Sequence, residues 1–216
     1  MPKYKLVLFD MDGTIANTDE MVVLSFLELF DKYGKGRRPT REELYYFSGP
    51  PLFESLKKLF PDGDMDLLFK EFYKISKPKY DEVVVTYPNA RKVIENFKKH
   101  GIKLGVVTNK KHDMSMYCLD IIGLYDLFDI VIGYEDVTKM KPDPEGILTA
   151  MARLGIQDGK DVLYVGDNPI DCYAGANANV DVAFACYGPR VFHDKILPTY
   201  RINSFKELEE VVLNEN

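Results

Sequence analysis

Two aspartates stand two positions apart where a short apolar run ends near the start of the chain. The run is Leu6–Phe9, and Asp10 and Asp12 follow it in the segment FDMDGT. Residues two apart on an extended chain share a face, so both carboxylates can flank one reacting group. One can attack phosphorus to form an aspartyl-phosphate, and the other can protonate the leaving oxygen and then activate water. Gly13 permits a tight turn whose backbone N–H groups could meet oxyanions.

Further polar residues follow apolar runs, or precede a helical stretch, later in the chain. They are Thr108 and Asn109, then Lys141, then Asp167 and Asn168 with Asp171 one helical turn later. In an open parallel sheet, ligands bind beyond the carboxyl ends of the strands, where the strand order reverses. We therefore expect all of these side chains to converge with Asp10 and Asp12 on one edge of a sheet.

Carboxylates gathered in this way repel one another unless a cation joins them. No histidine or paired cysteine lies among them, so the ligands are hard oxygens, which favour Mg²⁺ over zinc. Because Mg²⁺ completes its shell with water and phosphate oxygens, a phosphate ester is the expected substrate. Thr108 and Lys141 would then bind the oxygens of the transferring phosphoryl group.

Each motif taken alone also has a structural explanation. The aspartate segment could be a turn or part of a calcium loop, although Val22 stands where an EF-hand would need its last glutamate. The other motifs could be a strand end, a surface turn and a helix cap. It is their order, at successive strand ends, that favours a functional site.

The elements that must position these residues alternate between short apolar runs and helical stretches. Strands are expected at Leu6–Phe9 and at 103–109, 130–133, 162–166 and 182–185. Helices are expected at 89–100, 112–122, 143–155 and 169–178, the first three closed by Gly101, Gly123 and Gly155. This alternation predicts an α/β fold whose core is a Rossmann-like parallel sheet covered by helices.

The stretch 17–82 breaks this rhythm, since it is helical almost throughout and has no convincing strand. Its helical signals are apolar spacing from Val23 to Tyr33, a capping box at Thr40–Glu43, a helix opened by Gly49-Pro50-Pro51 and ended by Phe60-Pro61, and another from Met65 to about Ile75. We interpret 17–82 as an inserted all-helical cap domain, and 1–16 with 83–216 as the catalytic core.

Composition excludes several classes of protein. Net charge is −6 over 216 residues with no basic stripe, so no nucleic-acid partner is expected, and Arg37-Arg38 and Lys110-Lys111 are assigned to solvated surface. No apolar run is long enough to span a membrane or to act as a signal peptide. Cys118, Cys172 and Cys186 are interpreted as reduced and mostly buried, which predicts a cytoplasmic protein.

Taken together, the motifs resemble those of the haloacid dehalogenase superfamily, in the branch of phosphoglycolate phosphatases and related small phosphatases. By this resemblance Asp10 is the nucleophile and a metal ligand. Asp12 is the general acid and base and offers its backbone carbonyl to the metal. Thr108 and Lys141 hold the phosphoryl group, and Asp167 is a direct Mg²⁺ ligand.

The same resemblance gives Asp171 the role of orienting Lys141 or metal-bound water, with Asn109 and Asn168 as supporting contacts. It also places the strands that carry Asp10 and Asp167 side by side. The helical insert matches the family's cap, which closes over the site and excludes water. The cap segment GPPL at 49–52 is similar to that of bacterial pyrophosphatase-type members.

The resemblance implies a small phosphorylated metabolite, phosphoglycolate-like, or pyrophosphate as substrate. A haloacid dehalogenase lacks the second aspartate, so Asp12 argues against that activity. A phosphosugar mutase of the β-phosphoglucomutase type and a catalytically silent binding module on the same fold remain as alternatives. The sequence leaves open the physiological substrate, the oligomeric state, and the roles of Arg190 and His193.

Overall fold

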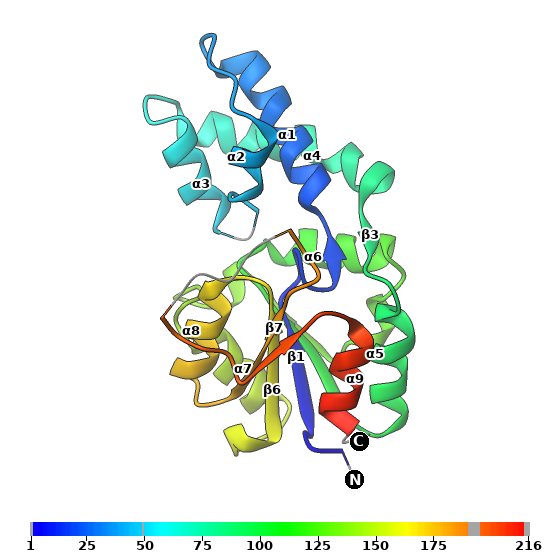
Figure 1. Cartoon of the computed structure of the whole chain (residues 1–216). Helices are drawn as coiled ribbons and strands as arrows, with labels where there is room; N and C mark the ends of the chain where they lie inside the picture. The colour runs from blue at the N-terminus through cyan, green and yellow to red at the C-terminus, as the bar shows by residue number, and fades with distance from the viewer. Residues whose placement is uncertain (1, 49, 190–194, 214–216) are drawn as a thin grey trace.

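A six-stranded parallel sheet forms the centre of the computed structural model, which describes residues 2–48, 50–189 and 195–213. The strand order is β5-β4-β1-β6-β7-β8 (Figure 1). The strands are β1 (Leu6–Phe9), β4 (Lys103–Val107), β5 (Ile130–Ile132), β6 (Val162–Gly166), β7 (Asp181–Ala185) and β8 (Tyr200–Ile202). The five predicted strands are all present, and the predicted α/β core is confirmed.

The side chains of β1 alternate between two helical layers, as the period of a strand requires. Val7 and Phe9 pack in the core that includes α5 and α9, whereas Leu6 and Leu8 pack in the core that includes α7 and α8. The helices that flank the sheet are α5 (Ala90–Lys99), α6 (His112–Ile121), α7 (Glu145–Arg153), α8 (Pro169–Asn177) and α9 (Phe205–Leu213). Because both faces are covered, every residue of β1 is buried.

The strand order reverses at β1. From β1 the sheet grows through β4 and β5 on one side, and the chain then returns to place β6 on the other side. Phe9 is in register with Val106 of β4 and Val165 of β6. The residues that follow these three strands therefore meet at one edge, and the predicted adjacency of the Asp10 and Asp167 strands is confirmed.

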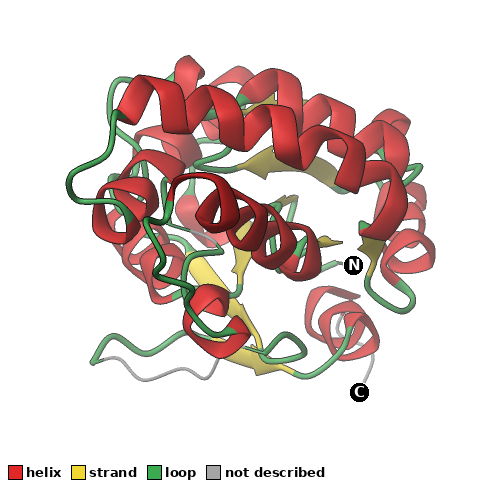
Figure 2. Ribbon diagram, turned by 90° about the horizontal axis from the view of Figure 1, so that it is seen from above, coloured by secondary structure: helices red, strands yellow, loops and turns green. Residues whose placement is uncertain are grey.

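Four helices form a separate layer above this edge, which we call the cap (Figures 1 and 2). They are α1 (Asp19–Tyr33), α2 (Arg41–Tyr45), α3 (Leu52–Leu59) and α4 (Met65–Val83). Aromatic rings join them: Phe26 lies 4.8 Å from Phe72, and Phe30 lies 4.2 Å from Phe60, between ring centroids. The capping box at Thr40 is confirmed, as is the inserted helical cap.

The cap also departs from prediction in two places. Helix α4 does not end near Ile75 but continues through Pro78 to Val83, because Tyr80 is buried and extends its packed face. Two short strands, β2 (Ala16–Asn17) and β3 (Val85–Thr86), pair antiparallel where the chain enters and leaves the cap. They lie at the expected junctions, but the exact domain boundaries stay a prediction.

The end of the chain holds a strand and a helix that the sequence pattern did not reveal. Strand β8 has only three residues, and α9 buries Phe205, Leu208 and Val212, so each signal is short. The glycines after α5, α6 and α7 have positive φ, as predicted. The cysteines are free, and Cys186 is only partly buried. None of the helices described is both long and apolar enough to cross a membrane.

Candidate active site

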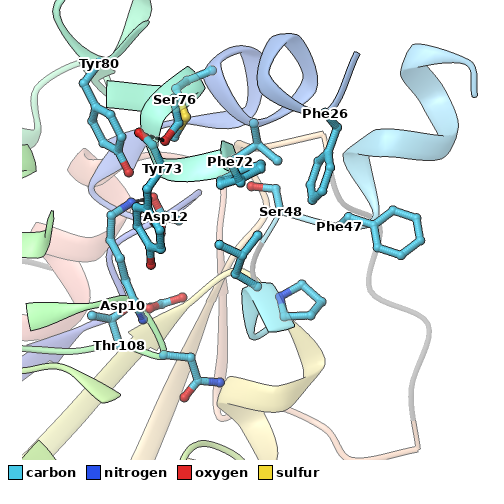
Figure 3. A pocket seen from close by; sticks show the side chains of 16 residues that line it. Asp10, Asp12, Phe26, Phe47, Ser48, Phe72, Tyr73, Ser76, Tyr80 and Thr108 are labelled. Atoms are coloured by element: carbon cyan, nitrogen blue, oxygen red, sulfur yellow. Dashed lines mark hydrogen bonds and ion pairs between the residues drawn. The ribbon is translucent and has the colours of Figure 1, made fainter. Parts of the chain in front are cut away.

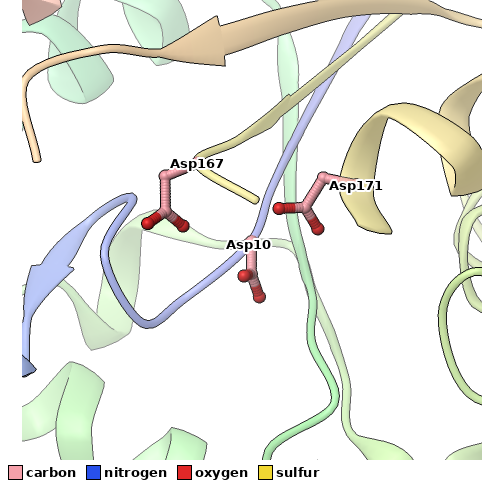
Figure 4. A group of neighbouring side chains, drawn as sticks. All are labelled: Asp10, Asp167 and Asp171. Atoms are coloured by element: carbon pink, nitrogen blue, oxygen red, sulfur yellow. The ribbon is translucent and has the colours of Figure 1, made fainter. Parts of the chain in front are cut away.

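Three carboxylates meet beyond the ends of β1 and β6 (Figure 4). Asp10 follows β1, Asp167 follows β6, and Asp171 lies in the first turn of α8. Each offers an oxygen within 4.8 Å of the oxygens offered by the other two, and all three residues are buried. Buried carboxylates at such distances repel one another strongly unless cations balance them.

The three carboxylates differ in how much of their bonding is already satisfied. Asp10 Oδ1 is buried, and it is engaged by the Lys141 ammonium at 2.9 Å in an ion pair. Asp167 Oδ1 accepts one from Thr14 Oγ1 at 3.1 Å. Asp171 has both oxygens engaged, one with Lys141 and Tyr164 and the other with the backbone N–H of Asn168. The cluster could hold a hard divalent cation, and Asp171, with both oxygens engaged, is the member suited to a supporting role.

Lys141 lies among these carboxylates and is held from several sides. Its Nζ lies 2.7 Å from Asp171 Oδ1 and 2.9 Å from Asp10 Oδ1, and it donates to Tyr164 Oη at 2.9 Å. Asn109 fixes the Lys141 backbone, accepting from its N–H at 2.9 Å and donating to its carbonyl at 3.2 Å. Asn109 thus contacts the loop that carries the lysine, and its predicted phosphate contact stays a prediction.

Burial and charge together set the proton affinity of this group. Burial raises the pKa of Asp10 to about 6; Lys141 opposes this rise, and the Asp171 and Asp12 carboxylates add to it. Burial acts to lower the pKa of Lys141, but Asp10 and Asp171 outweigh it and raise that pKa above the ordinary value. The ammonium thus stays charged, whereas the Asp10 carboxylate is poised between its two forms near pH 6.

Asp12 lies outside the three-carboxylate cluster and pairs with Lys110. Lys110 Nζ donates to the two Asp12 carboxylate oxygens at 2.7 and 3.0 Å, and its side chain is only 9% exposed. Its Nζ also lies 4.8 Å from the ring centroid of Tyr80 in α4. The assignment of Lys110 to solvated surface is therefore wrong: the turn after Asn109 folds this side chain inward, where a carboxylate and a ring replace its water.

Three smaller expectations meet the structure in different ways. Gly13 has φ of 82°, which explains its residue type, but its N–H donates to the Ala16 carbonyl at 2.8 Å and is engaged inside the loop. Thr108 is buried at the end of β4, and its Oγ1 accepts from the Lys110 N–H at 3.2 Å. Asn168 forms a capping box with Asp171 at the start of α8.

Sequence reasoning missed three residues that the structure places at the site: Lys110, Thr14 and Tyr164. Thr14 is part of the first motif, where its hydroxyl next to two aspartates was a usable signal. Lys110 follows Thr108 and Asn109 directly, so its position at a strand end was a signal too. Nothing in the sequence marked Tyr164 as a site residue, since an aromatic residue in a buried strand is typical of the hydrophobic core. Arg190 and His193 lie outside the described residues.

A cavity that is partly open to solvent lies between this edge of the sheet and the cap (Figure 3). Its floor includes Asp10, Asp12 and Thr108 from the core, and its other walls come mostly from the cap. A ligand in the cavity would therefore contact the carboxylates at one end and cap side chains around the rest.

The model of the haloacid dehalogenase-like hydrolase family matches residues 7–185, which include every motif described above. The chain belongs to this family. The resemblance inferred from the motifs is thus confirmed, and this family member is a hydrolase.

Several relatives match this hydrolase over nearly its whole length. It is 32% identical to a pyrophosphatase PpaX of Halalkalibacterium halodurans over 95% of both chains. It is 31% identical to a pyrophosphatase PpaX of Listeria monocytogenes, over 99% of this chain and 98% of the relative.

Solved structures share the fold. A haloacid dehalogenase-like hydrolase of Bacteroides fragilis superposes with a TM-score of 0.86 at 29% identity, covering 95% of this chain and 100% of the other. A protein of Haemophilus somnus described as a predicted phosphoglycolate phosphatase has a TM-score of 0.83 at 23% identity, covering 98% and 99%. At that identity the second likeness speaks for the fold alone.

Proposed function

We propose that this hydrolase is a Mg²⁺-dependent phosphatase that acts on a small phosphate monoester or on pyrophosphate through an aspartyl-phosphate at Asp10. One observation carries the proposal: a buried Asp10 oxygen lies 2.9 Å from the Lys141 ammonium, within a cluster of three carboxylates. An oxygen held in this way is a nucleophile with a cation beside it to neutralise the phosphoryl group that it attacks.

The first step transfers the phosphoryl group to the enzyme. An Asp10 oxygen forms a bond to phosphorus while the bond to the leaving oxygen breaks, and Asp12, when protonated, gives its proton to that oxygen. Lys141 and the Thr108 hydroxyl would bind the phosphoryl oxygens, on which negative charge gathers. A Mg²⁺ ion held by Asp10 and Asp167 would neutralise the same charge.

The second step releases phosphate. Asp12, now ionised, takes a proton from a water molecule, whose oxygen attacks the phosphorus of the aspartyl-phosphate and frees the Asp10 carboxylate. Lys110, bound to Asp12, would hold that carboxylate on the cavity side for both proton transfers. Asp171, Tyr164 and Asn109 would keep Lys141 in place throughout.

The substrate classes follow from the relatives. Relatives above 30% identity are named as pyrophosphatases, and the motifs resemble those of phosphoglycolate phosphatases and related small phosphatases. Pyrophosphate and small phosphate monoesters are therefore the first compounds to consider. The presence of Asp12 argues for a phosphatase rather than a dehalogenase.

The test is release of inorganic phosphate from a panel of phosphate monoesters and pyrophosphate, with Mg²⁺ and with a chelator. We expect release that requires Mg²⁺ and falls by about 10³-fold or more in Asp10→Asn, whose fold circular dichroism should show intact. Sugar monophosphates belong in the panel, since their interconversion without phosphate release would identify a mutase instead. Mg²⁺ binding without turnover on any compound would favour a silent binding module.

A further inference from the structure

We infer that the site is built for a phosphate monoester whose leaving group is uncharged and has an apolar face. This inference rests on the proposed function and narrows it, because it ranks pyrophosphate and phosphoglycolate below neutral organic phosphates. It comes from the chemistry of the cap wall rather than from the catalytic carboxylates.

The cap lines the cavity mainly with carbon. Met21, Val22 and Phe26 come from α1, Phe72 and Tyr73 from α4, and Leu52 from the start of α3. Figure 3 labels Phe26, Phe72 and Tyr73 among them. The smaller polar side chains that the cap adds are serines, Ser48 and Ser76, which are neutral and 1% exposed. Such a wall stabilises a bound ligand by burying the ligand's apolar surface, and its hydroxyls can form hydrogen bonds. It offers no charge.

The charged side chains that line the cavity are ones to which the proposed mechanism already gives a role. Among the described residues of the wall they are Asp10, Asp12 and Lys110. Lys110 is the only cation of this set, and its Nζ already donates to both Asp12 oxygens. Lys141 lies beneath, between Asp10 and Asp171. No cation of the described wall is therefore left to pair with a second anionic group on a substrate.

A leaving group that carries its own negative charge would thus be desolvated against apolar side chains of the cap. Burying an unpaired charge costs far more than burying a neutral group. A second phosphate, or the carboxylate of phosphoglycolate, bears this cost where it lies against the cap wall. A neutral alkyl or aryl leaving group avoids it and buries its own apolar surface as well.

Two pairs of substrates test this on the wild-type protein with saturating Mg²⁺. Ethyl phosphate and phosphoglycolate differ by a methyl group against a carboxylate, and we expect kcat/KM to favour ethyl phosphate by about tenfold or more. Benzyl phosphate adds apolar surface, and we expect it to exceed ethyl phosphate by about tenfold. Pyrophosphate should fall below both neutral esters.

A matched pair of variants assigns the effect to the wall. Leu52→Arg places a cation on the cavity lining, whereas Leu67→Arg makes the same change in the first turn of α4, at a residue that is 42% exposed. We expect the ratio of kcat/KM for phosphoglycolate over ethyl phosphate to rise about tenfold in Leu52→Arg, and to change by less than about twofold in Leu67→Arg.

The outcomes separate this inference from the function beneath it. A wild-type preference for pyrophosphate or phosphoglycolate over ethyl and benzyl phosphate would overturn the inference and leave the phosphatase intact. Equal shifts in the two arginine variants would also overturn it, because the wall would then not set the preference. Lack of Mg²⁺-dependent phosphate release from all four compounds would overturn the proposed function and the inference together.

Discussion

Two lysines pair with three of the four aspartates of the site. Lys141 lies between Asp10 and Asp171, and Lys110 is bound to Asp12. The aspartate proposed to attack phosphorus and the aspartate proposed to move protons therefore sit beside different cations, although they are two residues apart in the chain. This division gives each carboxylate its own electrostatic surroundings.

The pH dependence of metal binding follows from Asp10. Its pKa is raised to about 6, so the folded protein holds this proton more tightly than the unfolded chain does. Mg²⁺ requires the ionised carboxylate, so protons and Mg²⁺ compete. We expect the Mg²⁺ affinity to fall as pH drops through about 6, and the acid limb of kcat/KM to move to lower pH as Mg²⁺ is raised. Titrations at several fixed pH values would show this, and an acid limb unmoved by Mg²⁺ would contradict it.

Lys110 should matter most where the leaving group needs a proton. In Lys110→Met the Asp12 carboxylate loses a donor to both its oxygens, so we expect kcat/KM for ethyl phosphate to fall by about 10²-fold. p-Nitrophenyl phosphate, whose leaving group needs little protonation, should lose much less. Lys111→Met is the control, since Lys111 pairs with exposed Asp113. Equal losses on both substrates would show that Lys110 has no part in proton transfer.

Among the secondary-structure elements, α8 connects the site to the sheet through its first turn. Asp171 closes the capping box of α8 and also holds Lys141, while Tyr164 of β6 donates to the Val107 carbonyl at the end of β4. The start of α8 thus holds the Lys141 ammonium, and Tyr164 links strands β6 and β4. A substitution at Asp171 should therefore lower both the stability and the activity of the protein.

We expect Asp171→Asn to lower the free energy of unfolding by about 3 kcal/mol, because it removes one partner of a buried ion pair. Turnover should fall as well, since Lys141 is left with fewer fixed contacts. Urea unfolding and phosphate release would measure the two effects. Asp113→Asn, in the exposed first turn of α6, should change neither. Stability at the wild-type level would show that the Lys141 pair with Asp171 is not needed.

Elements with long or buried patterns could be predicted from the sequence, and short ones could not. The strand that precedes Asp10 and the helix that follows Asn168 had clear apolar patterns and caps. Strands β2 and β3 have two residues each, too few for any period to show. Helix α4 is longer than predicted because Tyr80 packs against the core despite Pro78. This is a tertiary contact, which local helix propensity does not include.

The same limit applies to the site. Asp10, Thr108, Lys141 and Asp167 could be placed together because parallel strands end at one edge. Which carboxylate pairs with which lysine depends on loop conformation, and no spacing rule gives it. The wall of the cavity could not be predicted from the sequence either, because it is assembled from α1, α3 and α4 and from the loop that contains Ser48.

For the whole molecule, bound Mg²⁺ should link the ends of two neighbouring strands and so stabilise the folded protein. Asp10 follows β1 and Asp167 follows β6, so a cation bound by both exists only in the folded protein. We expect Mg²⁺ to raise stability by about 2.7 kcal/mol at a hundred times its dissociation constant. Thermal unfolding with and without Mg²⁺ measures this. The shift should vanish in Asp167→Asn and persist in Asp113→Asn; an equal shift in both would place the metal elsewhere.

If the phosphoryl group passes through Asp10, the aspartyl-phosphate can be trapped at that residue. Wild-type protein turning over a good substrate with Mg²⁺ is quenched in acid, reduced with borohydride and digested for mass spectrometry. An aspartyl-phosphate is reduced to homoserine, so we expect homoserine at position 10 only, and none without substrate. Sustained turnover with Asp10 unmodified, or homoserine at position 12 instead, would contradict it.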